Sequence, residues 1–147
     1  MDAPGGPHPR LAAVIVAYDE AWNRHDVAAI LDRHTDDSVF ESHTTGECAR
    51  GKEAIRRMIE RLFATFPDVT FTIRRLYAQE GLVVQEWTAH ATHTRPVPTR
   101  DGIFPATGDS LSWRGVDVMP MRDDLIARKD AYADSAALLR QLVQGRR

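Results

Sequence analysis

The chain has 147 residues, of which 43% are hydrophobic, and 19 Lys and Arg stand against 21 Asp and Glu. This length and apolar content fit a single domain with one good core. A net charge near zero argues against nucleic acid as a partner, since a phosphate footprint needs clustered positive charge. No apolar run reaches membrane-spanning length, and the N-terminus lacks a signal-peptide segment. We therefore expect a soluble, cytoplasmic protein with no membrane partner.

The N-terminal half predicts three helices and one short strand. Residues 1–9 are rich in Pro and Gly and are expected to form a disordered tail. Apolar residues then recur at the spacing of one helix face from Leu11 to Trp22, and Asp26 can cap a second, shorter helix. Residues 37–43 have the pattern of a strand, and a third helix follows that stops at Pro67.

The C-terminal half predicts strands. Residues 69–77 and 82–93 alternate as one hairpin, and residues 94–109 hold three prolines and two glycines, which indicates a loop. Long ordered loops often line a binding site. A second hairpin and a short helix capped by Asp134 complete the order α-α-β-α-β-β-β-β-α. We expect an α+β fold in which a curved antiparallel sheet wraps around the N-terminal helices and leaves a cone-shaped cavity.

The second hairpin carries charged side chains where core strands are expected to be apolar. Counting back from a turn over residues 122–124 places Met121 opposite Leu125 and Asp117 opposite Lys129. An acid and an amine on an otherwise apolar face indicate a pocket rather than a plain core. The other members of that face are Trp113, Gly115, Met119 and Met121.

Several segments, in their order and spacing, resemble one known superfamily. They are YDEAWNRHDVAAI, DDSVFES, GKEAIRRM, the PATG loop at residues 105–108, and GVDV…RDDLIARKDAYAD…LLRQL. Together they resemble the nuclear transport factor 2-like superfamily and, within it, the SnoaL-like group of polyketide cyclase and steroid delta-isomerase-like proteins. The resemblance implies a single SnoaL-like domain over residues 10–147, a cone-shaped α+β barrel and a homodimer. The superfamily includes isomerases, cyclases, epoxide hydrolases, dehydratases and non-enzymatic binders.

The catalytic sets of that superfamily match this chain only in part. Tyr18 falls where steroid isomerases keep an oxyanion-hole tyrosine. Asp117 falls where they keep a protonated aspartate and where polyketide cyclases keep a histidine. The isomerase base falls at Ser42 and the cyclase acid/base at Ala131, and neither side chain can act as a base. The resemblance therefore implies either a different catalytic set or no chemistry.

Each candidate catalytic residue has two interpretations. Asp117 and Lys129 form either an acid/base pair in an apolar cone or a buried ion pair kept for specificity. Tyr18 either donates to an oxyanion beside a protonated Asp117 or is a core aromatic. The catalytic interpretation of the Asp117–Lys129 pair excludes that of Tyr18. Asp117 paired to a charged Lys129 stays ionised, so it cannot donate a hydrogen bond beside Tyr18. His43, near the expected cavity mouth, is either a second base or a solvated histidine.

The inner face predicts an apolar ligand of polyketide, terpenoid or steroid size, unless the same side chains simply fill the core. His90 and His93 are three residues apart on one strand and point to opposite faces, so no metal is predicted, and no cofactor. The residues expected to bind the ligand are Trp22, Phe40, Ser42, Trp87, His93, Trp113, Met119 and Met121.

These observations favour a small, cofactor-independent enzyme. We expect it to carry a carbonyl-bearing apolar substrate through an enol or enolate, by isomerisation, aldol-type cyclisation or elimination, with Asp117 as acid/base and Tyr18 as oxyanion donor. Lys129 would tune Asp117. The alternative is a non-catalytic ligand-binding or dimerisation module of the same fold.

Overall fold

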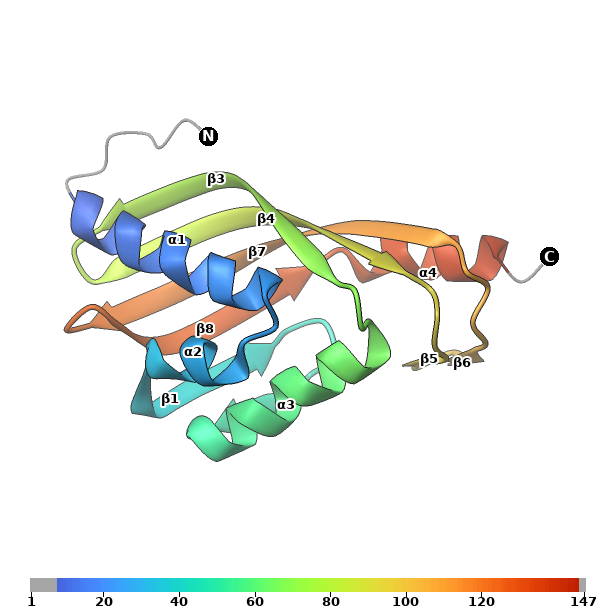
Figure 1. Cartoon of the computed structure of the whole chain (residues 1–147), viewed down its shortest axis with the longest axis horizontal. Helices are drawn as coiled ribbons and strands as arrows, with labels where there is room; N and C mark the ends of the chain where they lie inside the picture. The colour runs from blue at the N-terminus through green and yellow to red at the C-terminus, as the bar shows by residue number, and fades with distance from the viewer. Residues whose placement is uncertain (1–7, 146–147) are drawn as a thin grey trace.

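Three helices cover one face of a curved sheet in the computed structural model, which describes residues 8–145 (Figure 1). They are α1 (Pro9–Asn23), α2 (Val27–Asp32) and α3 (Lys52–Thr65). The fourth helix, α4 (Ser135–Gln144), packs on β7 at the end of the sheet away from α1 (Figure 1). Among these residues, no helix has the combination of length and apolar character that spanning a bilayer requires.

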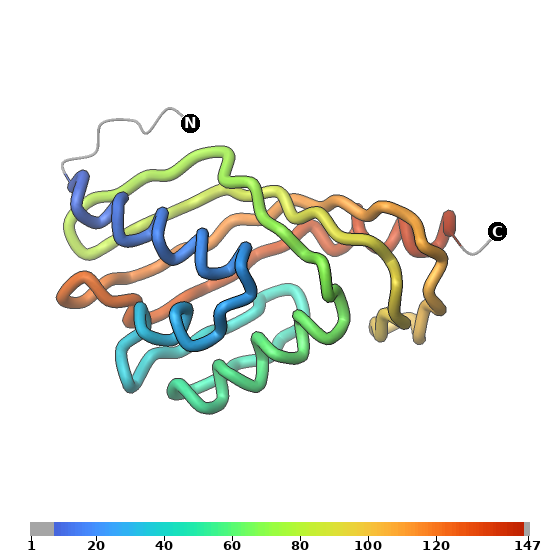
Figure 2. Tube along the Cα trace, viewed as in Figure 1, coloured from blue at the N-terminus to red at the C-terminus, as the bar shows by residue number. Residues whose placement is uncertain are grey.

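The main sheet has six strands in the order β2-β1-β8-β7-β4-β3. All neighbours are antiparallel except β1 and β8, which pair in parallel although they lie far apart in the sequence (Figure 2). A separate two-stranded hairpin is made by β5 (Val97–Thr99) and β6 (Gly102–Phe104). The main strands are β1 (His34–Ser42), β2 (Cys48–Arg50), β3 (Thr70–Gln79), β4 (Leu82–Thr92), β7 (Ser110–Arg122) and β8 (Leu125–Ala133).

The predicted α+β class, with its curved sheet around helices, is confirmed. Both predicted caps are present, since the side chains of Asp26 and Asp134 accept hydrogen bonds from the backbone three residues later, at 3.1 and 3.0 Å. Strands β2, β5 and β6 lie in segments that the sequence predicts to be loops. Residues 1–7 of the expected disordered tail lie outside the described residues. Pro9, which the sequence predicts to belong to the tail, is the first residue of α1, because proline is favoured in the first turn of a helix.

The predicted register of the β7–β8 hairpin is wrong. The turn has only two residues, Asp123 and Asp124, both with positive φ (52° and 62°), as a tight hairpin turn requires. Met121 therefore pairs with Ile126 rather than Leu125.

A shift in the pairing between Val118 and Met121 changes the register again, so that Asp117 pairs with Ala131 and not with Lys129. Lys129 is two residues from Ala131 and thus remains on the same face as Asp117. The acid and the amine are diagonal neighbours instead of a direct pair.

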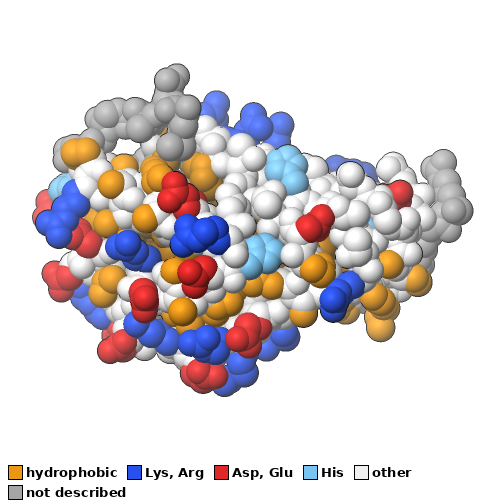
Figure 3. Space-filling model, viewed as in Figure 1, with side chains coloured by type: hydrophobic (Ala, Val, Ile, Leu, Met, Phe, Trp, Pro, Cys, Tyr) orange, Lys and Arg blue, Asp and Glu red, His pale blue; other side chains and the backbone are white. Residues whose placement is uncertain are grey.

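The described residues form two apolar clusters. One joins α1, α2 and α3 to the sheet, and the other lies under β5, β6 and α4. Acidic and basic side chains gather over α3 (Figure 3), where Glu53 pairs with Arg56 and Arg57. The outward face of α3 is therefore solvated, and its apolar face points into the domain.

Gly115 makes room for the indole of Trp87 on the inner face of the sheet. The two residues pair across β4 and β7, and a Cβ atom added to Gly115 would lie 2.2 Å from the Trp87 ring. Gly115→Ala is therefore expected to lower the free energy of unfolding by about 1 to 3 kcal/mol, because the ring has to move. Urea denaturation measures this change.

A double variant separates this overlap from other effects of the alanine. In the Trp87→Leu background the ring is gone, so Gly115→Ala is expected to have little effect there. An equal loss of stability in both backgrounds would contradict the prediction.

Candidate functional site

A cavity of about 910 Å³ lies between the helices, the inner face of the sheet and the β5–β6 hairpin, within the size range of small-molecule sites. Much of its wall is aromatic or aliphatic. Several residues predicted from the sequence do line it, namely Trp22, Phe40, Ser42, Trp87, Trp113, Asp117 and Lys129.

Asp117 and Lys129 form a buried ion pair in the wall. Their side chains approach to 3.5 Å between Lys129 Nζ and Asp117 Oδ2, and the residues are only 3% and 5% exposed. Burial by itself favours the neutral amine, but the charge of Asp117 and the contact with Tyr18 outweigh it and raise the pKa of Lys129. Lys129 is therefore a cation at neutral pH.

Three aromatic rings surround the ammonium group of Lys129. Nζ lies 4.5 Å from the ring centroid of Trp22, 4.9 Å from that of Phe40 and 5.0 Å from that of Tyr18. Each ring presents electron density to the cation. The rings therefore stabilise the ammonium at one place in the wall of the cavity.

Tyr18 belongs to a buried chain of hydrogen bonds and does not line the cavity. Lys129 Nζ donates to the Tyr18 hydroxyl at 3.2 Å, a bond of 3.0 Å joins that hydroxyl to His34 Nε2, and His34 Nδ1 contacts the Ser38 hydroxyl at 2.9 Å. Burial raises the pKa of Tyr18 and, with the charge of Lys129, lowers the pKa of His34 to about 3. Both side chains are neutral at pH 7, and the Tyr18 hydroxyl contacts Lys129 and His34.

Asp19 and Gln85 complete the polar end of the cavity, which we define as Asp19, Gln85, Asp117 and Lys129. Gln85 Nε2 donates to Asp19 Oδ1 at 3.0 Å and to Asp117 Oδ2 at 3.1 Å. Burial raises the pKa of Asp19 from 3.8 to about 7, although the bond from Gln85 and the charge of Lys129 oppose the rise. Asp19 thus exchanges a proton near neutral pH, as a general acid or base requires.

The sequence interpretation missed Asp19 and Gln85, and a signal for each was available. Asp19 follows Ile15 by four residues and precedes Trp22 by three, so it shares their helix face. Gln85 has the same strand parity as Trp87. A polar side chain on an otherwise apolar face marks a site in both elements.

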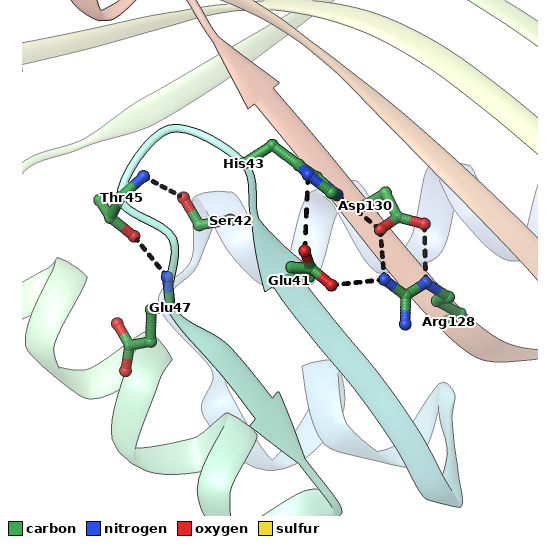
Figure 4. Close-up of polar contacts among 7 residues, drawn as sticks. All are labelled: Glu41, Ser42, His43, Thr45, Glu47, Arg128 and Asp130. Atoms are coloured by element: carbon green, nitrogen blue, oxygen red, sulfur yellow. Dashed lines mark hydrogen bonds and ion pairs between the residues drawn. The ribbon is translucent and has the colours of Figure 1, made fainter.

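His43 lies away from the cavity, contrary to the expected position at its mouth. Because Ser42 faces the cavity, the next side chain points to the other face of the sheet. There His43 stacks on Tyr132, with ring centroids 4.2 Å apart, and contacts Asp130 at 2.8 Å and Glu41 at 3.5 Å (Figure 4). His43 is not among the residues that line the cavity.

The outer-face group around His43 is the one set of described residues with the spacing of metal ligands. Ligand atoms of Glu41, His43 and Asp130 lie within 4.8 Å of one another. Arg128 already donates to both carboxylates at 2.7 Å (Figure 4) and holds the pKa of Asp130 below its usual value. The arginine supplies the positive charge that two acids paired across β1 and β8 require.

Three other residues that were predicted to contact a ligand do not line the cavity. His93 is buried and does not line the cavity; its Nε2 donates to the carbonyl oxygen of Phe104 at 3.2 Å, and its Nδ1 contacts the Thr107 hydroxyl at 3.2 Å. It fastens the segment that carries β5 and β6. Met119 and Met121 are buried in the apolar cluster that joins the helices to the sheet and also do not line the cavity.

The mouth of the cavity consists of its exposed lining residues. Arg61 on α3 pairs with Glu47 from the segment after β1. Arg100 and Asp101, at the turn of the β5–β6 hairpin, lie on the same cavity. The mouth thus carries both signs of charge, whereas the middle of the cavity is apolar.

Comparisons with known proteins agree with this architecture. IdmH of Streptomyces antibioticus, a proposed polyketide cyclase, aligns over 91% of this chain and 99% of its own with 22% identity and a TM-score of 0.78. AclR of Streptomyces galilaeus, a proposed hydroxylase, aligns over 91% and 96% with 23% identity and a TM-score of 0.76. A proposed polyketide cyclase of Acidithiobacillus ferrooxidans aligns over 92% and 95% with 22% identity and a TM-score of 0.78.

The solved structures share the fold at low identity, and the comparison with curated proteins gave no match. The family model described as the SnoaL-like domain matches residues 15–129, which span α1 to β8 and include all four members of the polar end. The chain belongs to the SnoaL-like domain family.

Proposed function

We propose that this protein is a cofactor-independent acid–base enzyme that carries an apolar carbonyl compound through an enol or enolate. The observation that supports it best is the polar end of the cavity, where Asp19 titrates near pH 7 beside the cationic Lys129. Proton transfer at carbon needs one group that can lose or gain a proton and another that stays charged, and the surroundings of Asp19 and Lys129 favour these two different states.

Asp19, as carboxylate, would take a proton from the carbon next to the substrate carbonyl. The electron pair of that C–H bond forms the C=C bond of the enolate, the π pair of the carbonyl moves to its oxygen, and Lys129 stabilises the negative charge that develops there. Asp19 then returns its proton to a different carbon, to an alkoxide formed by carbon–carbon bonding, or to a departing hydroxyl. These three outcomes are isomerisation, aldol-type cyclisation and elimination.

Asp117 has a different role in this proposal from the acid/base that the sequence favours. Its ion pair with Lys129 keeps the ammonium charged in a buried place, and Tyr18 holds the same ammonium from the other side. The apolar middle of the cavity suits a flat, hydrophobic molecule. A polyketide fits this description, and two of the similar structures are proposed polyketide cyclases.

Proton exchange tests the proposal without knowledge of the physiological substrate. Ligands would first be selected by thermal shift from aromatic polyketides, enones and steroids, and then incubated with the protein in D₂O. The native chain is expected to catalyse incorporation of deuterium next to the carbonyl. Asp19→Asn should reduce the rate by about 10² to 10⁴, while Glu60→Gln, which changes an exposed carboxyl group on α3, should not.

Two other outcomes would contradict the proposal, one for the enzymatic activity and one for the role of Asp19. Ligands that bind without exchange would indicate the alternative, a non-catalytic ligand-binding module. The same rate in the native chain and in Asp19→Asn would remove Asp19 from the mechanism.

A further inference from the structure

Gln85 joins the two carboxyl groups of the polar end through a single nitrogen atom. It lies on β4 directly opposite Asp117 on β7, and its residue is only 2% exposed. The amide has two N–H bonds and uses both, one toward Asp19 from α1 and one toward Asp117.

The orientation of this amide is fixed by its neighbours. An ionised carboxylate only accepts hydrogen bonds, so whenever Asp19 is ionised the opposite orientation would place the amide oxygen against two acceptor groups. In the observed orientation Gln85 Oε1 is buried and has no hydrogen-bond partner among the described residues. An unpaired buried oxygen is unfavourable for the fold, so the two hydrogen bonds that the amide nitrogen donates have to outweigh that cost.

The two carboxyl groups differ in what else they contact. Asp117 Oδ2 also faces the ammonium of Lys129 on β8, at 3.5 Å. Asp19 receives its one described hydrogen bond from Gln85. The charged groups that act on Asp19 are Lys129, Asp117 and, on its own helix, Glu20.

We propose that Gln85 is a positioning residue: its amide holds the Asp19 carboxyl group beside that of Asp117 and stabilises the ionised form of Asp19. This inference rests on the proposed function, in which Asp19 is the group that transfers the proton. The contact through Gln85 stabilises the ionised form of Asp19, and so limits how far burial favours the protonated form.

The test is a titration of the Asp19 carboxyl by ¹³C NMR, with its signal identified by its absence in Asp19→Asn. In Gln85→Met, which keeps a similar unbranched shape without N–H groups, the midpoint is expected to rise by about one pH unit, because a hydrogen bond to the charged form is lost. Gln79→Met, at the exposed end of β3, is the matched control and should leave the midpoint unchanged. An unchanged midpoint in folded Gln85→Met would overturn the inference.

The native chain provides a second measurement in case Gln85→Met does not fold. The side-chain ¹H–¹⁵N signals of Gln85 should shift with pH at the same midpoint as the Asp19 carboxyl. Signals that do not respond over that range would overturn the inference.

The two proposals can fail separately. If the NMR midpoints shift as expected but no deuterium exchange is seen, only the enzymatic function is contradicted. Exchange that depends on Asp19 with no shift in Gln85→Met contradicts only the role of Gln85.

Discussion

Replacing Lys129 with methionine is expected to lower the free energy of unfolding by about 3 to 5 kcal/mol. Methionine fills a similar space, but it leaves the Asp117 carboxylate in the wall with no opposite charge, at 3% exposure. The favourable contacts of the ammonium with the three rings disappear as well. Urea denaturation at pH 7 measures the loss.

Two further variants show whether the effect comes from the unpaired charge. Asp117→Asn combined with Lys129→Met removes both charges and is expected to recover most of the stability, because no ion is then left buried alone. Lys52, the other lysine of the chain, forms a partly exposed pair with Asp36, and Lys52→Met should change the stability by less than about 1 kcal/mol. If Lys129→Met unfolded at the same urea concentration as the native chain, the ion pair would contribute nothing to the free energy of unfolding.

Replacing Asp19 with asparagine is expected to stabilise the protein above pH 7 and to leave its stability nearly unchanged in acid. Burial raises the pKa of this carboxyl from 3.8 to about 7, so between these values the folded state binds more protons than the unfolded state. The contribution of Asp19 to the free energy of unfolding therefore falls as pH rises through that window. Above that pH window the free energy of unfolding of the native chain is lower by at most about 4 kcal/mol. Asparagine does not ionise, so Asp19→Asn does not lose this stability.

The measurement is the difference in unfolding free energy between Asp19→Asn and the native chain, taken in urea from pH 4 to pH 8. Taking the difference cancels the titration of groups that the two proteins share. Glu60→Gln is the control, because Glu60 is an exposed carboxyl group on α3, away from Asp19. A difference that stays constant over this range would show that Asp19 ionises as freely in the folded chain as in the unfolded one.

Features decided by a few neighbouring residues were predictable from the sequence. The helix caps at Asp26 and Asp134 and the stop at Pro67 follow from local geometry and are found where they were expected. The three-residue strands β2, β5 and β6 depend on their partners rather than on their own pattern. The parallel pairing of β1 with β8 is likewise a contact between distant segments.

The error in the β7–β8 register had an available signal. Pro120 lies where the pairing shifts, and proline has no N–H group to donate to a neighbouring strand. The face of a strand depends only on alternation, so Asp117 and Lys129 were still predicted on one face. The same rule, applied from Ser42, places His43 on the outer face.

The two ends of the cavity are built from different parts of the chain. The polar end comes from α1 and the central strands, whereas much of the mouth comes from a separate hairpin that His93 fastens at its base. Substitutions in that hairpin change the mouth without replacing any member of the polar end. The mouth and the polar end of this domain can therefore vary independently in evolution.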